Sequence, residues 1–234
     1  MSQLEIPADR LETATAQEVL EWALPRFGDR IAIASSFGVE DVTLIDIAAQ
    51  IRSTVRVFCL DTGRLHQQTY DLMDRIRNRY GLTIEVLYPS TPDLESMVRE
   101  HGINLFYDSI ENRRRCCDVR KVQPLRRVLS TLDAWVTGLR REQNVSRANI
   151  AKVEVDHANG GLLKINPLAD WSHDQLWAHI RDHSVPYNTL HDEGYPSIGC
   201  EPCTRPVQTD EDPRSGRWWW ESAETRECGL HVED

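Results

Sequence analysis

The residues of this sequence with the clearest chemical potential are its cysteines. Cys116 and Cys117 are adjacent, Cys200 and Cys203 form a Cys-x-x-Cys pair, and Cys228 lies close to the C-terminus. Four thiolates can bind either a zinc ion or an iron–sulfur cluster, because both accept four cysteine ligands. A set of free structural thiols is the remaining alternative.

The adjacency of Cys116 and Cys117 bears on the choice of metal. Neighbouring side chains on a helix point about 100° apart, and in a strand they face opposite ways. Two adjacent thiolates would therefore strain the backbone if both reached one small tetrahedral ion. A cubane offers four separate iron corners, so the spacing favours a four-iron, four-sulfur (4Fe-4S) cluster over zinc at these two residues together with Cys200 and Cys203.

Composition and charge restrict the class of protein. The chain has 234 residues, of which 40% are hydrophobic, and a formal net charge of −10. It shows neither a basic, apolar leader nor about 18 consecutive apolar residues, so we expect a cytoplasmic protein with no membrane segment. In that compartment, clustered cysteines more often bind metals or do redox chemistry than form disulfides. The net negative charge disfavours nucleic acid as a partner but is compatible with a local basic pocket.

Short β-rich runs alternate with helical patterns along much of the chain. This alternation predicts an α/β fold with a mainly parallel sheet flanked by helices, whose ligands bind at the carboxyl ends of the strands. From about Gly194 the pattern dissolves, so we predict one domain over residues 1–210 and a tail over residues 211–234. The expected strands are 30–36, 54–63, 83–90 and 132–139, and the expected helices are 37–52, 66–81 and 91–102.

The loops after three of these strands are rich in small or hydrogen-bonding residues. They read "SSFGVED" from Ser35, "LDTGR" from Leu60 and "TGLRREQ" from Thr137. Such loops suit close approach to a nucleotide phosphate or base, although each is also compatible with an ordinary turn. Cys59 lies within an apolar strand, and the tryptophan run at 218–220 is expected to anchor the tail by packing.

Several motifs together resemble a known enzyme family. "LDTGRLHQQTY", "CCDVRKVQPLRRVL", "WVTGLRREQ", "GCEPCTRPV", "RSGRWWW" and "ECGLH" are similar, in order, to the assimilatory adenylyl-sulfate reductases, relatives of the phosphoadenylyl-sulfate reductases. The doubled cysteine with Cys-x-x-Cys resembles the cluster-bearing branch. The resemblance implies an adenine nucleotide alpha-hydrolase-like (PP-loop related) fold with a mobile C-terminal tail. It also implies thioredoxin-dependent reduction of adenosine 5′-phosphosulfate to sulfite and AMP, in sulfate assimilation and cysteine biosynthesis.

The resemblance assigns roles to individual residues. Cys228 is the expected nucleophile, which forms an S-sulfocysteine that a thioredoxin or glutaredoxin thiol resolves, and a terminal position suits both steps. Cations are needed because a thiolate approaches an anionic substrate. The resemblance implies that the phosphosulfate is bound by Lys121, Arg147, Arg214 and Arg217. It implies that the nucleotide lies on a loop formed by Ser35, Ser36, Phe37 and Gly38, with backbone contacts from Leu60, Gly63 and Gly138. His231 is expected to help close the tail over the substrate.

Two other functions stay open at this point. One is reduction of the 3′-phosphorylated substrate, or of both substrates. The other is a zinc-stabilised nucleotide-binding module in which Cys228 has no role. A relative that activates ATP for thiolation is disfavoured, because "SSFGVED" lacks the Gly-Gly and Asp-Ser pattern of that loop. A homo-oligomer is compatible with the sequence.

Overall fold

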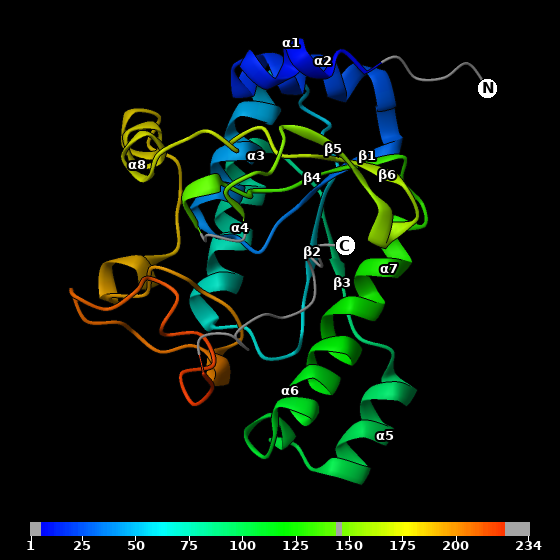
Figure 1. The fold of residues 1–234 in the computed structure, drawn as a ribbon, viewed down its shortest axis with the longest axis vertical. Coiled ribbons are helices and arrows are strands. Elements are labelled where there is room, and N and C mark those ends of the chain that lie inside the picture. Colours follow the sequence, from blue (N-terminus) through cyan, green and yellow to red (C-terminus); the bar gives the residue numbers. More distant parts are fainter. Residues whose placement is uncertain (1–5, 144–146, 223–234) are drawn as a thin grey trace.

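A central sheet of six strands organises the fold in the computed structural model, which describes residues 6–143 and 147–222 (Figure 1). The strand order is β3-β2-β1-β4-β6-β5, and neighbouring strands are parallel except for the β5–β6 pair. The predicted α/β fold with a mainly parallel sheet is confirmed. The strands are β1 (Ile31–Ala34), β2 (Val57–Leu60), β3 (Ile84–Leu87), β4 (Ala134–Val136), β5 (Val153–Asp156) and β6 (Leu162–Ile165).

Helices cover both faces of the sheet because successive strand residues point to opposite sides. Ile31 and Ile33 of β1 belong to the large core beneath α2, α3, α4 and α8, whereas Ala32 between them packs with α7. The helices are α1 (Ala8–Thr13), α2 (Ala16–Phe27), α3 (Val39–Ile51), α4 (Gln67–Tyr80), α5 (Thr91–His101), α6 (Ile110–Cys117), α7 (Gln123–Leu129) and α8 (His173–Asp182).

Helix α3 is the most enclosed of these helices. It is apolar around most of its circumference, with Val42, Leu44, Ile45 and Ala48 all fully buried. A helix with this pattern must be surrounded by other elements. Contacts with α2, α4 and α8 provide that enclosure. The N-terminus of α3 is thereby fixed directly after the loop that follows β1.

The cysteine pair lies where one helix changes its winding. Cys116 and Cys117 end α6, and Asp118–Val122 continue as a π-helical turn before α7 begins. Pro124 has no backbone N–H with which to continue the α-helical ladder, which favours a break at this place. Isolated π turns are frequent at functional sites. The sequence analysis assigned no element here.

A separate small core surrounds the cysteines, at the end of the molecule where α5 and α6 lie (Figure 1). It contains Phe106 and Trp218, with Trp218 only 1% exposed, whereas Trp219 is 38% exposed. An ion pair joins Arg113 of α6 to Glu221 through two contacts of 2.9 Å. Trp218 and Glu221 of the predicted tail therefore pack beside α6, and residues 223–234 of that tail lie outside the described residues.

Several elements were not assigned from the sequence. These are α1, α2, α6, α7, α8 and the antiparallel β5–β6 pair. The predicted strands and helices up to β4 are present, within shorter bounds than expected. Within residues 6–143 and 147–222, no helix is both long and apolar enough to span a bilayer.

The Arg113–Glu221 pair generates a stability prediction. Its side chains are only 1% and 3% exposed, so Glu221→Gln would leave a buried guanidinium without its counter-charge. We expect the free energy of unfolding to fall by about 3 kcal/mol, measured by urea titration. Glu211→Gln is the matched control, because its partner Arg205 and Glu211 itself are 34% and 32% exposed, and a loss of about 1 kcal/mol or less is expected there. Equal losses in the two variants would contradict a special role for the buried pair.

Candidate active site

A large cleft opens at the carboxyl ends of β1, β2 and β4. Its volume is about 830 Å³. From β1 the chain continues to β2 and β3 on one side, and it then crosses to β4 on the other side of β1, so the strand order reverses at β1. Such a switch point is where open α/β sheets bind their ligands. The cleft therefore has the position and the size for a nucleotide.

The loop after β1 is held by its own side chains. The backbone N–H and the hydroxyl of Ser36 both donate to Asp41 Oδ2, at 2.6 and 2.8 Å. The backbone N–H of Phe37 donates to Ser35 Oγ at 3.1 Å. Phe37 has a φ of 60° and a side chain that is 1% exposed. This residue anchors the loop in the core instead of facing the cleft.

Asp41 connects this loop to the one after β4. Burial raises the pKa of Asp41 to about 6, against the opposing effect of the hydrogen bonds from Ser36. Gly138 passes so close that a Cβ there would lie 2.6 Å from Asp41 Oδ1 and 2.7 Å from Glu40 Cβ. A side chain at position 138 would force these two loops apart. Glycine is thus required by the close approach and not by its φ angle.

The two arginines after β4 have different surroundings. Arg140 lines the cleft and is paired with Glu40 at 3.1 Å and with Glu142 at 3.4 Å. Arg141 contacts Glu12 and the carbonyl of Ile150, away from the cleft. The sequence did not distinguish these two neighbours.

Most of the predicted substrate residues line the same cleft. Phe37 is buried beneath it, and Gly63 lies beside Arg120 next to the cysteines. Cys228 and His231 lie outside the described residues. His173, Trp177 and His191 also line the cleft, although no sequence signal singled them out. The predicted residues that line it are Ser35, Ser36, Gly38, Leu60, Lys121, Gly138, Arg147, Arg214 and Arg217.

The four clustered cysteines line one small cavity. Cys116 and Cys117 come from the end of α6, and Cys200 and Cys203 from the loop across from it. None of them forms a disulfide. Among the described residues, no three of these sulfurs belong to a group with all ligand atoms within 4.8 Å of one another. The four sulfurs therefore line the same cavity but are not close enough together to bind one small ion.

Cations surround this cavity, and the sequence analysis identified only part of them. Arg64, Arg113 and Arg120 line it in addition to Lys121 and Arg217. Arg120 is 6% exposed and donates from Nη1 to the carbonyl of Thr62 at 2.6 Å. Its buried Nε has no hydrogen-bond partner in the described part of the chain. An anionic group in the cavity would give this N–H an acceptor.

The thiols differ in how readily they ionise. Burial raises the pKa of Cys203 to about 12 and also raises that of Cys116. Burial acts in the same direction on Cys200, but Lys121, the Thr62 hydroxyl at 3.2 Å and the arginines outweigh it and lower the pKa of Cys200. Burial raises the pKa of Cys59 beyond its usual range, as expected for an inert thiol inside a strand.

Three residues lie between the cleft and the cysteine cavity. Lys121, Arg217 and Trp218 line both. The Arg217 guanidinium stacks over the Trp218 ring, 4.8 Å from its centroid. A side chain at Gly199 would collide with this guanidinium, so the glycine before Cys200 makes room for it. The same cations can thus act on thiolates on one side and on a bound anion on the other.

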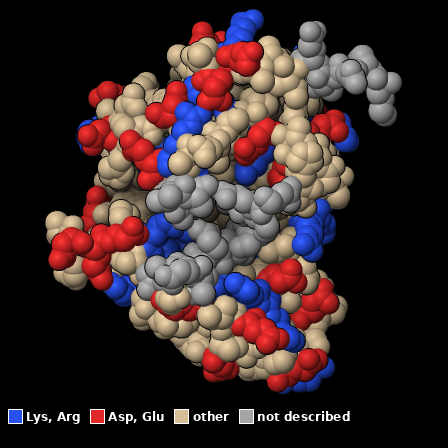
Figure 2. Space-filling model, in the orientation of Figure 1, with Lys and Arg blue, Asp and Glu red and all other residues tan. Residues whose placement is uncertain are grey.

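The charge around the cleft contrasts with the acidic chain as a whole. Figure 2 shows Lys and Arg side chains interspersed with Asp and Glu over this face of the molecule. The net charge is −10, yet Lys121, Arg140, Arg147, Arg214 and Arg217 all line the cleft. A local basic site within an acidic surface suits a small anionic ligand better than a polyanion.

Comparison with known proteins connects these features to a family. Residues 30–206 match the phosphoadenosine phosphosulfate reductase domain. An adenosine 5′-phosphosulfate reductase of Burkholderia cepacia is 48% identical, covering 94% of this chain and 89% of its own length. Another from Allochromatium vinosum is 49% identical, covering 98% of this chain and 90% of its own length.

A solved structure agrees with the sequence comparisons. A phosphoadenylyl-sulfate reductase from Candida auris, in complex with phosphate, has a TM-score of 0.74 and 29% identity, covering 88% of this chain and 99% of that one. The predicted family resemblance and fold are confirmed. The chain belongs to the phosphoadenosine phosphosulfate reductase domain family, and it is an oxidoreductase similar in sequence to adenosine 5′-phosphosulfate reductases.

Proposed function

We propose that this protein reduces adenosine 5′-phosphosulfate to sulfite and AMP in the cytoplasm, with a thioredoxin or glutaredoxin as the electron donor. The observation that carries the proposal is the position of Lys121 and Arg217, which line both the nucleotide-sized cleft and the cysteine cavity. A phosphosulfate group bound next to these two side chains would meet cations that also face the cysteine thiols. The relatives named adenosine 5′-phosphosulfate reductase support the same substrate.

The cleft would hold the nucleotide through backbone groups. The loop from Ser35 to Gly38 lies at the end of β1, where hydrogen bonds to Asp41 fix its shape before any ligand binds. Gly138 and Leu60, at the ends of the flanking strands, bring further backbone close to the same space. A preformed cradle of this kind reduces the entropy lost when the ligand binds.

The residues around the small cavity suit a four-iron, four-sulfur cluster, held by Cys116, Cys117, Cys200 and Cys203. A tetrahedral zinc ion with bonds of about 2.3 Å would hold its sulfurs about 3.8 Å apart, whereas these four do not meet that closely. A cubane separates its ligands further, and its negative charge would give Arg120 Nε an acceptor. When bound, the cluster would supply a fixed anionic charge next to the substrate cations.

The chemistry itself needs a nucleophile and a reductant. The thiolate of Cys228 attacks the sulfate sulfur, the bond from that sulfur to the bridging phosphate oxygen breaks, and AMP leaves. A thiolate of the reductant then attacks Cys228 Sγ, and sulfite leaves with the electron pair. The second thiol of the reductant closes its disulfide and restores Cys228. Two electrons from a dithiol thus reduce the sulfur of sulfate to that of sulfite.

The positive side chains would act on the first of these steps. Lys121, Arg214 and Arg217 neutralise the approach of a thiolate to an anionic substrate and stabilise the departing phosphate, and Arg147 adds a further positive charge to the cleft. Charge-assisted hydrogen bonds of this type are the strong ones, and arginine offers two donors in a plane. The remaining alternatives, the 3′-phosphorylated substrate and a zinc-stabilised binding module, are separated by the measurements below.

Replacing one cluster ligand tests the metal assignment. Cys200→Ser should lose most of the iron and acid-labile sulfide of anaerobically purified protein, because a hydroxyl is a poor ligand for iron in such clusters. Cys59→Ala is the matched control, since Cys59 is buried in β2 and lies in the large core, and it should keep its iron. Zinc in place of iron in the wild-type protein would support the binding-module alternative and reject the cluster.

The close approach at Gly138 gives a prediction for nucleotide binding. Gly138→Ala would push a methyl group into Asp41 and Glu40, and overpacking of this kind costs about 1–3 kcal/mol. We expect AMP affinity, measured by calorimetry, to fall about tenfold or more. Gly38→Ala adds the same methyl at ordinary contact distances, the nearest being 3.7 Å, and should have the smaller effect. The reverse order would argue against a nucleotide cradle built on Asp41.

The nucleophile can be identified in a single turnover. Incubation with adenosine 5′-phosphosulfate and no reductant should release AMP and leave a sulfonate on the peptide that contains Cys228, detected by mass spectrometry. Cys228→Ser should bind AMP and retain iron, yet form no adduct. A sulfonate on Cys59, or wild-type turnover by the serine variant, would contradict the mechanism. Turnover rates measured side by side with adenosine 5′-phosphosulfate and with its 3′-phosphorylated form decide between the two reductase alternatives.

A further inference from the structure

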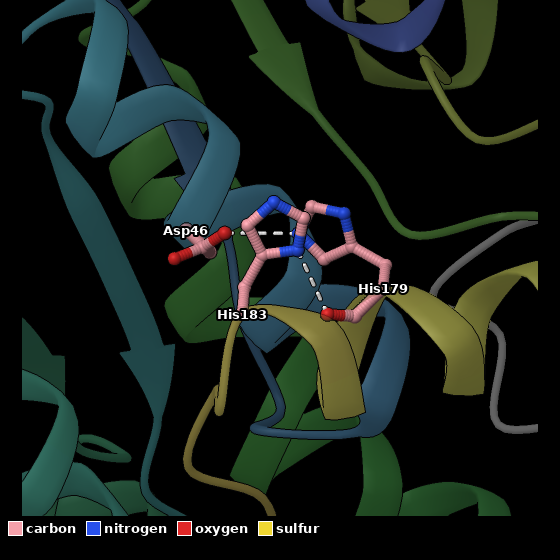
Figure 3. Close-up of side chains that lie close together, drawn as sticks. All are labelled: Asp46, His179 and His183. Carbon is pink, nitrogen blue, oxygen red and sulfur yellow. Dashed lines mark hydrogen bonds and ion pairs between the residues drawn. The ribbon is translucent and has the colours of Figure 1, made fainter.

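Three side chains from α3 and α8 come together on a part of the molecule that the proposed function does not use. Asp46 lies on α3, His179 lies on α8, and His183 is the residue that caps the end of α8 (Figure 3). One ring nitrogen of each histidine and one carboxylate oxygen lie within 4.8 Å of one another. Among the described residues, no other group of three or more His, Cys, Asp or Glu side chains is so close.

The two histidines meet as a stacked pair, and the hydrogen bond made by one of them determines which of its nitrogens can bind a metal. Their rings are stacked, with centroids 4.0 Å apart and planes inclined by 23°. His183 Nδ1 lies 3.0 Å from the carbonyl oxygen of His179, and since a carbonyl can only accept, Nδ1 carries the proton. In the neutral form of this ring the lone pair is therefore on Nε2, and a neutral imidazole nitrogen is the form that binds metals.

The carboxylate of Asp46 is oriented by groups behind it. The Tyr80 hydroxyl donates to Oδ1 at 2.8 Å, and Gln50 Nε2 donates to Oδ2 at 3.2 Å. Outer hydrogen bonds of this kind commonly orient carboxylates that bind metals. His179 Nε2 lies 2.9 Å from Oδ2, where it donates to the carboxylate, so an ion bound to both groups takes the place of that proton. Of these three neighbours only His179 can carry a positive charge, so a cation at this place would compensate a buried carboxylate.

Burial differs across the group in a way that leaves one side accessible. Asp46 is 3% exposed, whereas His183 is exposed and His179 is intermediate. An ion could enter from the side of His183, and water could complete its coordination there. Three protein ligands with an open position form a recurrent arrangement for zinc.

We propose that Asp46, His179 and His183 bind a divalent cation of the zinc type, with water as a further ligand. The ion joins α3 to α8. These three residues line neither the cleft nor the cysteine cavity, so the ion stays remote from the reacting atoms. Helix α8 also carries His173 and Trp177, which do line the cleft, and its attachment to α3 therefore fixes one wall of the cleft.

Zinc titration of the anaerobically purified protein, with its cysteine cavity in the native state, tests the proposal. Equilibrium dialysis should show one site that is lost in His183→Ala, with affinity reduced about 100-fold or more, and Tyr80→Phe should reduce affinity about tenfold. His183 is exposed, so its removal leaves the core intact. His157→Ala removes another exposed histidine outside the group and should leave zinc affinity unchanged.

X-ray absorption at the zinc edge distinguishes this site from the cysteines. Nitrogen and oxygen ligands at about 2.0–2.1 Å support the proposal, whereas sulfur ligands at about 2.3 Å alone overturn it. Unchanged zinc affinity in His183→Ala, or equal losses in His183→Ala and His157→Ala, would also overturn it. The outcome is independent of the proposed function, because none of these measurements uses turnover.

Discussion

The buried ion pair between Arg113 and Glu221 determines how the two reactive regions are joined. It fastens the segment before residue 223 to α6, the helix that ends in the cysteine pair. The guanidinium carbons of Arg113 and Arg217 both lie over the Trp218 ring, 4.9 and 4.8 Å from its centroid. Removing two charges from water is costly, so such a pair is weak evidence of net stability. Its consequence is geometric, because it places Arg217 between the cysteines and the cleft.

This geometry gives the acidic chain a strongly basic interior site. Arg120 and Lys121 belong to the π turn directly after Cys117, and the wider winding of that turn brings both side chains to the cysteine cavity. The backbone thus supplies thiols and cations from one short segment. Nearby cations favour the charged form of a thiol, which explains how the pKa of Cys200 is lowered although burial acts to raise it.

Sequence predicts those parts of this structure that depend on residues close together in the chain, and it does not predict those that depend on contacts between distant segments. Alternating strand and helix patterns depend on neighbours in the chain, and the predicted elements up to β4 are present. The roles of Arg64, Arg113 and Arg120 depend on contacts between distant segments, such as Arg113 with Glu221, and no local pattern signals them. The hairpin of β5 and β6 was missed for a similar reason, because those strands are short and lie beyond the regular alternation. The C-terminal cysteine was assigned by resemblance alone.

Helix α3 shows why residue type alone does not determine chemistry. Asp41 and Asp46 lie five positions apart on it, so they point in different directions around the helix. Burial raises the pKa of Asp41 to about 6, because the hydrogen bonds from Ser36 do not offset it. Burial acts on Asp46 in the same sense, but hydrogen bonds from His179 and Tyr80 outweigh it and lower the pKa of Asp46. One carboxylate shapes a loop beside the cleft, and the other faces imidazoles on α8. Because α3 is enclosed on most sides, it holds both in place on a rigid element that connects the cleft to the α8 contact.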